Sequence, residues 1–192
     1  MRKAVFLDRD GVINENVDDL ISPDQFRMFP EAPKAILSLH EAGYLIIVVT
    51  NQPSIAKGFC TMDDIKRIHK KMEKELLREG ARVDAIYVCP HHPEKGHSGE
   101  IKELKIDCDC RKPKPGLLLG AMREHDIDPK KSYMVGDSLS DIAAGKEAGC
   151  VTILLKKGGG AKTVHKKMTI HMPDFTVHDL TEAASVILKK SS

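Results

Sequence analysis

Short apolar runs recur along the chain, and segments with helical periodicity lie between them. The runs are continuous rather than alternating, which is typical of strands buried on both faces of a parallel sheet. We expect strands at residues 4–7, 44–50, 85–88, 133–135 and 151–155. The pattern therefore predicts a parallel sheet at the centre of the fold.

The segments between these runs carry helix signals. Residues 62–79 place Ile65, Ile68 and Met72 on one stripe, with Thr61 and Asp64 as a capping pair at the start. Further helices are expected at 31–41, 115–125, 139–148 and about 180–189. Alternating strands and helices predict the α/β class, as a doubly wound, Rossmann-like parallel sheet with helices on both faces. We expect residues 1–192 to form a single domain.

Composition narrows the class of protein. Hydrophobic residues make up 41% and charged residues 30% of the chain, as in soluble globular proteins. The net charge of +2 is spread along the chain and aromatic residues are only 4%, so we expect no nucleic-acid partner. The longest apolar run, 45–49, is too short to cross a bilayer, and no secretion leader is recognisable. We expect a cytoplasmic monomer without a membrane partner, and we read the lysine-rich segments 66–74 and 156–167 as solvated surface.

Polar motifs follow four of the expected strands. "DRDG" follows the first, "TNQ" the second and "GDSLSD" the fourth, while a Cys/His-rich loop and "RKPKPG" follow the third. Ligands of open α/β sheets gather at the carboxyl ends of the strands. Asp8, Asp10 and Asp137 offer there the hard oxygen ligands that suit Mg²⁺. A lone Asp-x-Asp more often caps a turn, but a second acidic strand end favours a metal site.

The remaining strand ends offer groups that bind phosphate. A carboxylate about 4 Å from one like charge is repelled by about 4 kcal/mol at an effective dielectric near 20, and a phosphate dianion roughly doubles this. Asp8 therefore needs Mg²⁺ and further cations to attack a phosphate. Thr50 can hydrogen-bond phosphoryl oxygens, and Lys112 can neutralise charge in the transition state. Taken singly, Thr50 reads as a strand-end cap and Lys112 as a surface lysine.

The Cys/His-rich loop, residues 89–110, carries a candidate second metal site. Its spacing pairs Cys89 with His91 and Cys108 with Cys110, each pair separated by one residue. Four ligands without a vacancy indicate a structural Zn²⁺, and the alternative is a set of small buried cysteines. Competing ligands in the loop are His92 and His97.

A zinc ion would explain why this loop is followed directly by a basic segment, residues 111–114, which contains Arg111, Lys112 and Lys114. The sizeable apolar side chains of the loop are only Ile101, Leu104 and Ile106, so burial alone cannot order it. Zinc binding in small finger peptides amounts to about 10–16 kcal/mol, enough to offset much of the ordering entropy. We expect the ion to fix Arg111 and Lys112 over the active site.

Four segments resemble, in order, the motifs of the haloacid-dehalogenase (HAD) phosphatase superfamily: "FLDRDGVIN", "VVTNQ", "RKPKPG" and "VGDSLSDIAAGKEAG". The resemblance covers essentially the whole chain and implies an HAD-like fold with a minimal cap. It implies that Asp8 is the nucleophile that forms an aspartyl-phosphate, and that Asp10 protonates the leaving oxygen and then activates water. It also implies a Mg²⁺ held by Asp8, the backbone carbonyl of Asp10 and Asp137.

The same resemblance implies roles for the other site residues. Thr50 and Lys112 would stabilise the phosphoryl group, and Arg111 would orient the substrate. Asp141 is a candidate partner for Lys112 or for a metal-bound water. Further substrate contacts are expected from Asn51, Gln52 and Ser138.

The Cys-x-His…Cys-x-Cys-Arg-Lys-Pro segment resembles the zinc-containing branch of the superfamily, which holds heptose bisphosphate phosphatases and histidinol-phosphatases. The long zinc loop favours the first of these, so the expected substrate is a small phosphorylated metabolite, a heptose bisphosphate. Pro53 and Ser54 stand where the family has a Ser-Gly pair, and residues 16–20 also depart from its pattern. These departures leave histidinol phosphate or another small sugar phosphate as alternatives. A phospho-accepting receiver domain is the alternative of a different class, although it needs neither a second acid such as Asp10 nor a zinc loop.

Overall fold

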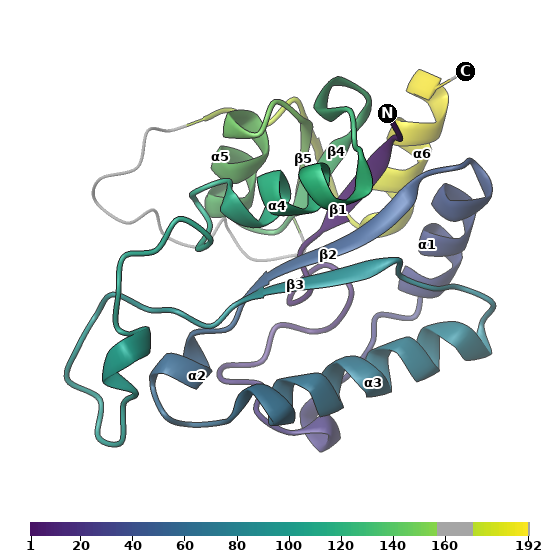
Figure 1. The fold of residues 1–192 in the computed structure, drawn as a ribbon. Coiled ribbons are helices and arrows are strands. Elements are labelled where there is room, and N and C mark those ends of the chain that lie inside the picture. Colours follow the sequence, from purple (N-terminus) through teal and green to yellow (C-terminus); the bar gives the residue numbers. More distant parts are fainter. Residues whose placement is uncertain (157–170, 192) are drawn as a thin grey trace.

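The computed structural model describes residues 1–156 and 171–191, and its centre is a six-stranded parallel sheet (Figure 1). The strands are β1 (Ala4–Leu7), β2 (Leu45–Asn51), β3 (Ala85–Cys89), β4 (Tyr133–Gly136), β5 (Val151–Leu155) and β6 (Phe175–Val177). Their order across the sheet is β3-β2-β1-β4-β5-β6. This is a doubly wound order in which the direction of winding reverses between β1 and β4, where such folds bind ligands.

Helices cover both faces of the sheet. They are α1 (Ala32–Glu41), α2 (Pro53–Ala56), α3 (Met62–Arg78), α4 (Gly116–His125), α5 (Leu139–Glu147) and α6 (Leu180–Ser191), with short 3-10 helices at Pro23–Gln25, Lys102–Leu104 and Pro129–Lys131. In Figure 1, α4 and α5 lie on one face and α1 and α3 on the other, and α6 packs against α1. Within the described parts of the chain, we find no helix with the length and apolar character needed to span a membrane.

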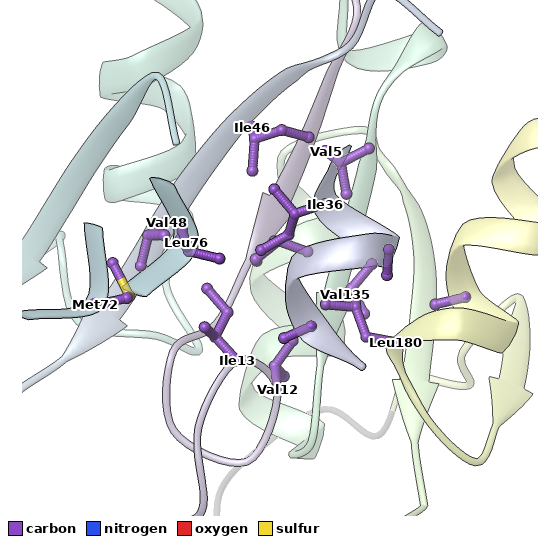
Figure 2. Packing of buried hydrophobic residues seen from close by; sticks show 14 of the residues in the cluster. Val5, Val12, Ile13, Ile36, Ile46, Val48, Met72, Leu76, Val135 and Leu180 are labelled. Atoms are coloured by element: carbon purple, nitrogen blue, oxygen red, sulfur yellow. The ribbon is translucent and has the colours of Figure 1, made fainter. Parts of the chain in front are cut away.

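Alternate side chains of the strands enter two separate cores. Val5 and Leu7 of β1 pack in one core with Ile36 of α1 (Figure 2), whereas Phe6 packs in the other with Leu118 of α4. All of these side chains are fully buried. Because burying one large apolar side chain contributes about 1.5–3 kcal/mol, β1 is held firmly from both sides. The position of the residues that directly follow β1 is therefore well defined.

The expected α/β fold is confirmed. Each expected strand and helix is present, with ends within two residues of the predicted positions. The capping pair of α3 forms as predicted: Asp64 donates its backbone N–H to Thr61 Oγ1 at 3.2 Å, and Thr61 donates its N–H to Asp64 Oδ2 at 2.7 Å. Of the lysine-rich segment 156–167, all but Lys156 lies outside the described residues.

One strand and one α-helix of the described chain, β6 and α2, have no counterpart in the sequence prediction, and neither do the three short 3-10 helices. β6 is a three-residue edge strand with partly exposed side chains, too short to form an apolar run. Its position is fixed by the preceding Asp174, whose Oδ2 accepts from the backbone N–H and the hydroxyl of Thr152 in β5, at 2.8 and 2.9 Å. The short α2 begins at Pro53, one of the residues that depart from the family pattern.

Candidate active site

The carboxyl ends of β1 and β4 bring acidic residues together. Asp8 follows β1 directly and Asp137 follows the neighbouring β4. Their carboxylates and that of Asp141 supply oxygens that all lie within 4.8 Å of one another. Gly11 permits the approach, because its φ is +84° and a Cβ there would collide with the Asp137 carboxylate. The glycine of "DRDG" is therefore required by the acid that comes from the other strand.

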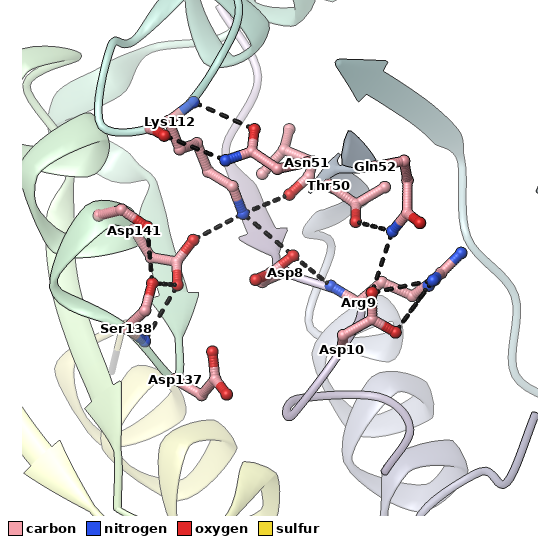
Figure 3. Close-up of polar contacts among 12 residues, drawn as sticks. Asp8, Arg9, Asp10, Thr50, Asn51, Gln52, Lys112, Asp137, Ser138 and Asp141 are labelled. Carbon is pink, nitrogen blue, oxygen red and sulfur yellow. Dashed lines mark hydrogen bonds and ion pairs between the residues drawn. The ribbon is translucent and has the colours of Figure 1, made fainter. Parts of the chain in front are cut away.

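Lys112 is buried between two of these acids (Figure 3). Its Nζ lies 3.0 Å from Asp8 Oδ1 and 2.6 Å from Asp141 Oδ1, and it donates to the Val49 carbonyl at 2.8 Å. The Lys112 side chain is 1% exposed, so water screens these ion pairs little. The surface-lysine alternative is therefore wrong.

Burial and the neighbouring charges shift the pKa values of Asp8 and Lys112. Burial raises the pKa of Asp8 to about 7; Lys112 opposes the rise, and the neighbouring acids add to it. Burial also disfavours the charged form of Lys112, but Asp141 and Asp8 outweigh this and hold its pKa at about 12. Lys112 thus stays protonated, whereas Asp8 keeps its charge poorly without a further cation. Such an acid-rich site is suited to a divalent metal ion.

The start of α5 orients Asp141. Its Oδ2 accepts from the Ser138 hydroxyl at 2.6 Å and from the Ser138 backbone N–H at 3.1 Å, which caps the helix. Gly136 leaves the room for this side chain, because a Cβ there would collide with Asp141. The other oxygen of Asp141 is thereby aimed at Lys112.

β2 fixes the backbone of the basic segment over the acids. Asn51, the last residue of β2, donates its Nδ2–H to the Lys112 carbonyl at 3.0 Å and accepts from the Lys112 N–H at 3.1 Å. Asn51 was predicted as a substrate contact, and in the structure its amide binds the protein backbone. This pair of hydrogen bonds determines where the Lys112 side chain enters the site.

The carboxylate of Asp10 lies in a separate hydrogen-bond network (Figure 3). Arg9 donates to Oδ1 from Nε at 3.1 Å and to Oδ2 from Nη2 at 2.8 Å. Asn14 donates to Oδ1 at 2.9 Å, and Gln52 to Oδ2 at 3.0 Å. Gln52 also donates to Thr50 Oγ1 at 2.9 Å. The Asp10 side chain is therefore not part of the carboxylate cluster, and its backbone carbonyl is left as the candidate ligand.

Asp8 and Asp137 line a cavity of 610 Å³, whereas Asp141 is buried behind it. Its lining includes the predicted residues Asp8, Asp10, Asn51, Gln52, Arg111, Asp137 and Ser138, together with Asn16, Val17, Asp18, Asp19, Leu20, Pro53, Ser54, Lys57, Leu139 and Ser140. Thr50 and Lys112 are buried, at 1% and 3% exposure, and are not among the lining residues. The two stretches that depart from the family pattern meet in the wall, where Ser54 donates to Asp19 Oδ1 at 2.6 Å. Lys57 Nζ lies 3.6 Å from the same oxygen.

A second cluster joins the end of β3 to the 89–110 loop. It consists of the Sγ atoms of Cys89, Cys108 and Cys110 and a ring nitrogen of His91. Contacts among these atoms measure 3.2–3.6 Å. A tetrahedral Zn²⁺ with bonds of about 2.3 Å would separate its sulfur ligands by about 3.8 Å, so the cluster fits this ion after small shifts. The competing His92 and His97 are not members of the cluster.

The loop contacts both walls of the cavity. On one side Ile101 donates its N–H to the carbonyl of Ala56 at 3.0 Å, and Gly58 packs directly against the backbone of Gly99. On the other side Arg111 donates to the carbonyl of the cluster residue His91 at 3.3 Å. A disturbance of the Cys/His cluster would therefore reach both walls.

Comparisons with known proteins agree with this geometry. Residues 109–183 match a family model described as HAD-hydrolase-like. The chain is 44% identical over 160 residues to a D-glycero-β-D-manno-heptose-1,7-bisphosphate 7-phosphatase of Pasteurella multocida, covering 83% of this chain and 84% of that one. It is 35% identical over 191 residues to the enzyme of that name from Pseudomonas aeruginosa, covering 98% and 99% of the two chains. The chain belongs to the HAD-like heptose bisphosphate phosphatase family.

Members of this family are phosphoric monoester hydrolases, and solved structures support the same assignment. The D,D-heptose 1,7-bisphosphate phosphatase of B. bronchiseptica, solved with magnesium and phosphate, superposes with a TM-score of 0.82 at 34% identity over 99% of both chains. The corresponding enzyme of Burkholderia thailandensis gives 0.65 at 29% identity, over 97% of this chain and 99% of that one. The predicted phosphatase activity and superfamily are thus confirmed.

Sequence reasoning missed two side chains at the centre of this HAD-like phosphatase. Arg9, inside "DRDG", is fully buried, and its Nη1 lies 3.1 Å from His69 Nε2. Burial, together with the Arg9 charge, lowers the pKa of His69 to about 3, so this imidazole is neutral. The signal that could have found the pair is a histidine on the apolar stripe of α3, between Ile65 and Met72.

Proposed function

We propose that this protein is a Mg²⁺-dependent D-glycero-β-D-manno-heptose-1,7-bisphosphate 7-phosphatase that works through an aspartyl-phosphate. The observation that carries the proposal is the buried Lys112 ammonium, 3.0 Å from Asp8 Oδ1 at the point where the winding of the sheet reverses. Relatives of that name match across nearly the whole chain. A neighbour that binds magnesium and phosphate supports the choice of metal.

The reaction would proceed in two displacements. The Asp8 carboxylate attacks phosphorus while the bond to the sugar oxygen breaks, and Asp10 gives that oxygen its proton. Asp10 then takes a proton from water, whose oxygen attacks phosphorus and releases Asp8 and phosphate. Lys112 favours the ionised form of Asp8 and neutralises charge on the phosphoryl group, to which Thr50 donates a hydrogen bond. A Mg²⁺ held by Asp8, Asp137 and the Asp10 carbonyl would supply the remaining positive charge.

The cavity wall carries two side chains able to bind the second phosphate of a bisphosphate. Beside its acids the wall carries two cations, Arg111 and Lys57. A second phosphate would be repelled by the acids and would need these cations, Lys57 exchanging its 3.6 Å contact with Asp19 for the ligand. Histidinol phosphate carries a cationic amine in place of a second phosphate, so the two cations would not help to bind it. Arg111 is therefore proposed to orient the distal phosphate.

A comparison of substrates tests this proposal. We expect kcat/KM for the heptose bisphosphate to exceed that for histidinol phosphate by at least about 100-fold, which corresponds to about 2.7 kcal/mol. Arg111→Met should shrink this ratio by about tenfold, whereas Arg123→Met, at the far end of α4, should leave it unchanged. The opposite ranking would refute the substrate assignment and leave the phosphatase chemistry standing.

We propose a structural Zn²⁺ at the four-residue Cys/His cluster. Burial and the neighbouring thiols raise the pKa of Cys110, so this thiol needs a nearby cation to become the thiolate that binds zinc. Cys110→Ser should lose bound zinc, expose residues 89–110 to proteolysis and lower kcat/KM by about 100-fold, because Arg111 and Lys112 follow the cluster directly. Metal analysis and limited proteolysis would measure this. Cys150→Ser, a buried thiol outside the cluster, is the matched control, and a Cys110→Ser variant that keeps its zinc would contradict the assignment.

The proposed function also bears on domain organisation, location and partners. We propose that residues 1–192 act as one domain, as a cytoplasmic monomer without a nucleic-acid or membrane partner. A receiver-type role is disfavoured by the family assignment, since a receiver would retain its aspartyl-phosphate instead of turning it over. Histidinol phosphate and other small sugar phosphates remain the alternatives that the substrate comparison distinguishes.

A further inference from the structure

Arg9 is a fully buried cation with partners on two sides. Its Nε and Nη2 face the Asp10 carboxylate as a fork, with Nη2 at 3.0 Å from Oδ1 and 2.8 Å from Oδ2. Its Nη1 faces His69 Nε2 at 3.1 Å. A buried charge persists in a folded protein only when it is paired and hydrogen-bonded, since an unpaired one costs several kcal/mol. The guanidinium is thus held in one orientation by one acid and one imidazole.

His69 serves this arrangement as a hydrogen-bond acceptor. It lies on the buried stripe of α3, which packs beneath the strands. An arginine can only donate, so Nε2 of His69 must carry the lone pair and Nδ1 the hydrogen. The low pKa of His69 agrees with a neutral ring beside a permanent cation. The histidine therefore anchors the end of Arg9 that does not touch Asp10.

Both carboxylate oxygens of Asp10 are consequently held by hydrogen bonds from neighbouring side chains. Besides Arg9, its oxygens accept from Asn14 at 2.9 Å and from Gln52 at 3.0 Å. The amides can be rotated by modest side-chain movement, but a bidentate guanidinium fixes both the position and the plane of a carboxyl group. Position is what a proton donor needs, because errors of about 1 Å at a reacting group reduce rates by about 100-fold.

We propose that Arg9, anchored by His69, is a positioning residue that fixes the carboxyl of Asp10 for proton transfer to the leaving oxygen. The inference rests on the proposed function, in which Asp10 is the acid. It makes Arg9 part of the chemistry without any contact between Arg9 and the substrate. It also explains why the fold accepts an arginine at a position that an apolar side chain could fill at lower desolvation cost.

The choice of leaving group tests this role. A sugar alkoxide needs a proton as it departs, whereas p-nitrophenolate leaves readily without one. In single-turnover rapid-quench measurements, Arg9→Met should therefore slow phosphoenzyme formation from the heptose bisphosphate by about 100-fold, and from p-nitrophenyl phosphate by less than about fivefold. KM for both substrates should change by less than about threefold. A purely structural role would slow phosphoenzyme formation from both substrates alike, and that result would overturn the proposal.

A double-mutant cycle with Asp10→Asn separates positioning from folding. If Arg9 acts through Asp10, Arg9→Met should lower the residual turnover of Asp10→Asn by less than about threefold. Full additivity would refute the inference while leaving the phosphatase assignment intact, because the wild-type activity tests that assignment separately.

Should Arg9→Met fail to fold, the variants His69→Gln and His69→Leu replace it. Glutamine keeps a hydrogen-bond acceptor for Arg9 and should retain most activity on the sugar phosphate. Leucine should slow phosphoenzyme formation from the sugar phosphate alone by about tenfold, and equal losses in the two variants would overturn the anchoring role of His69.

Discussion

An Asp8→Asn variant is expected to lose turnover by at least about 10⁴-fold and to form no covalent phosphoenzyme. The amide has nearly the shape of the carboxylate and keeps an oxygen near Lys112, but it cannot attack phosphorus. Steady-state assays with the heptose bisphosphate and rapid acid quench with a labelled phosphate would measure the two losses. Turnover within about tenfold of wild type would contradict the nucleophilic role.

The stability of this variant provides the control. Asp8 has its pKa raised to about 7 by burial, above the unfolded value, so its ionised form destabilises the metal-free fold as pH rises above the unfolded pKa. A neutral asparagine removes this penalty. Asp8→Asn should therefore unfold at a temperature no lower than the wild type in Mg²⁺-free buffer at pH 8, and the lost activity cannot then be attributed to misfolding.

Replacing Lys112 with methionine should lower kcat by about 10³-fold and the free energy of unfolding by about 3–5 kcal/mol at pH 8. The buried ammonium lies within 3.0 Å of both Asp8 and Asp141, so its removal leaves the buried carboxylate of Asp141 facing the partly buried one of Asp8. The loss of stability should shrink as pH falls towards 5, because Asp8 then binds a proton in the folded state. Denaturant titrations at several pH values would measure this trend.

Lys105→Met is a matched control for Lys112→Met. Lys105 belongs to the 89–110 loop, which precedes Lys112 in the chain. Its side chain is also 1% exposed, and its Nζ lies 3.6 Å from Glu100, away from the carboxylate cluster. Its replacement should lower kcat by less than about threefold. A Lys112→Met variant that keeps more than about a tenth of the wild-type kcat would contradict the assigned charge neutralisation.

The fold was largely predictable because its strands are buried on both faces. Such strands read as continuous apolar runs, and the helices between them carry capping signals such as Thr61 with Asp64. β6 escaped prediction because a three-residue edge strand held by Asp174 leaves no periodic signal. Its pairing depends on a contact with Thr152, 22 residues away in sequence.

The site was predictable to the extent that it lies at strand ends. The structure brings Asp8, Asp137, Asp141 and Lys112 together because β1 and β4 are neighbours and Asn51 binds the Lys112 backbone. The Arg9–His69 contact joins residues 60 apart in sequence, and neither residue type signals burial by itself. The separation of the Asp10 side chain from the carboxylate cluster likewise involves Gln52, which lies between β2 and α2.

The stereochemistry at phosphorus tests the central claim most directly. Hydrolysis of a heptose bisphosphate analogue whose 7-position carries a thiophosphate made chiral with two oxygen isotopes, in water labelled with the third isotope, gives inorganic thiophosphate of defined configuration. Two successive in-line displacements, by Asp8 and then by water, predict net retention. Net inversion would mean that water attacks the ester directly, and the assignment of Asp8 as the nucleophile would then be wrong.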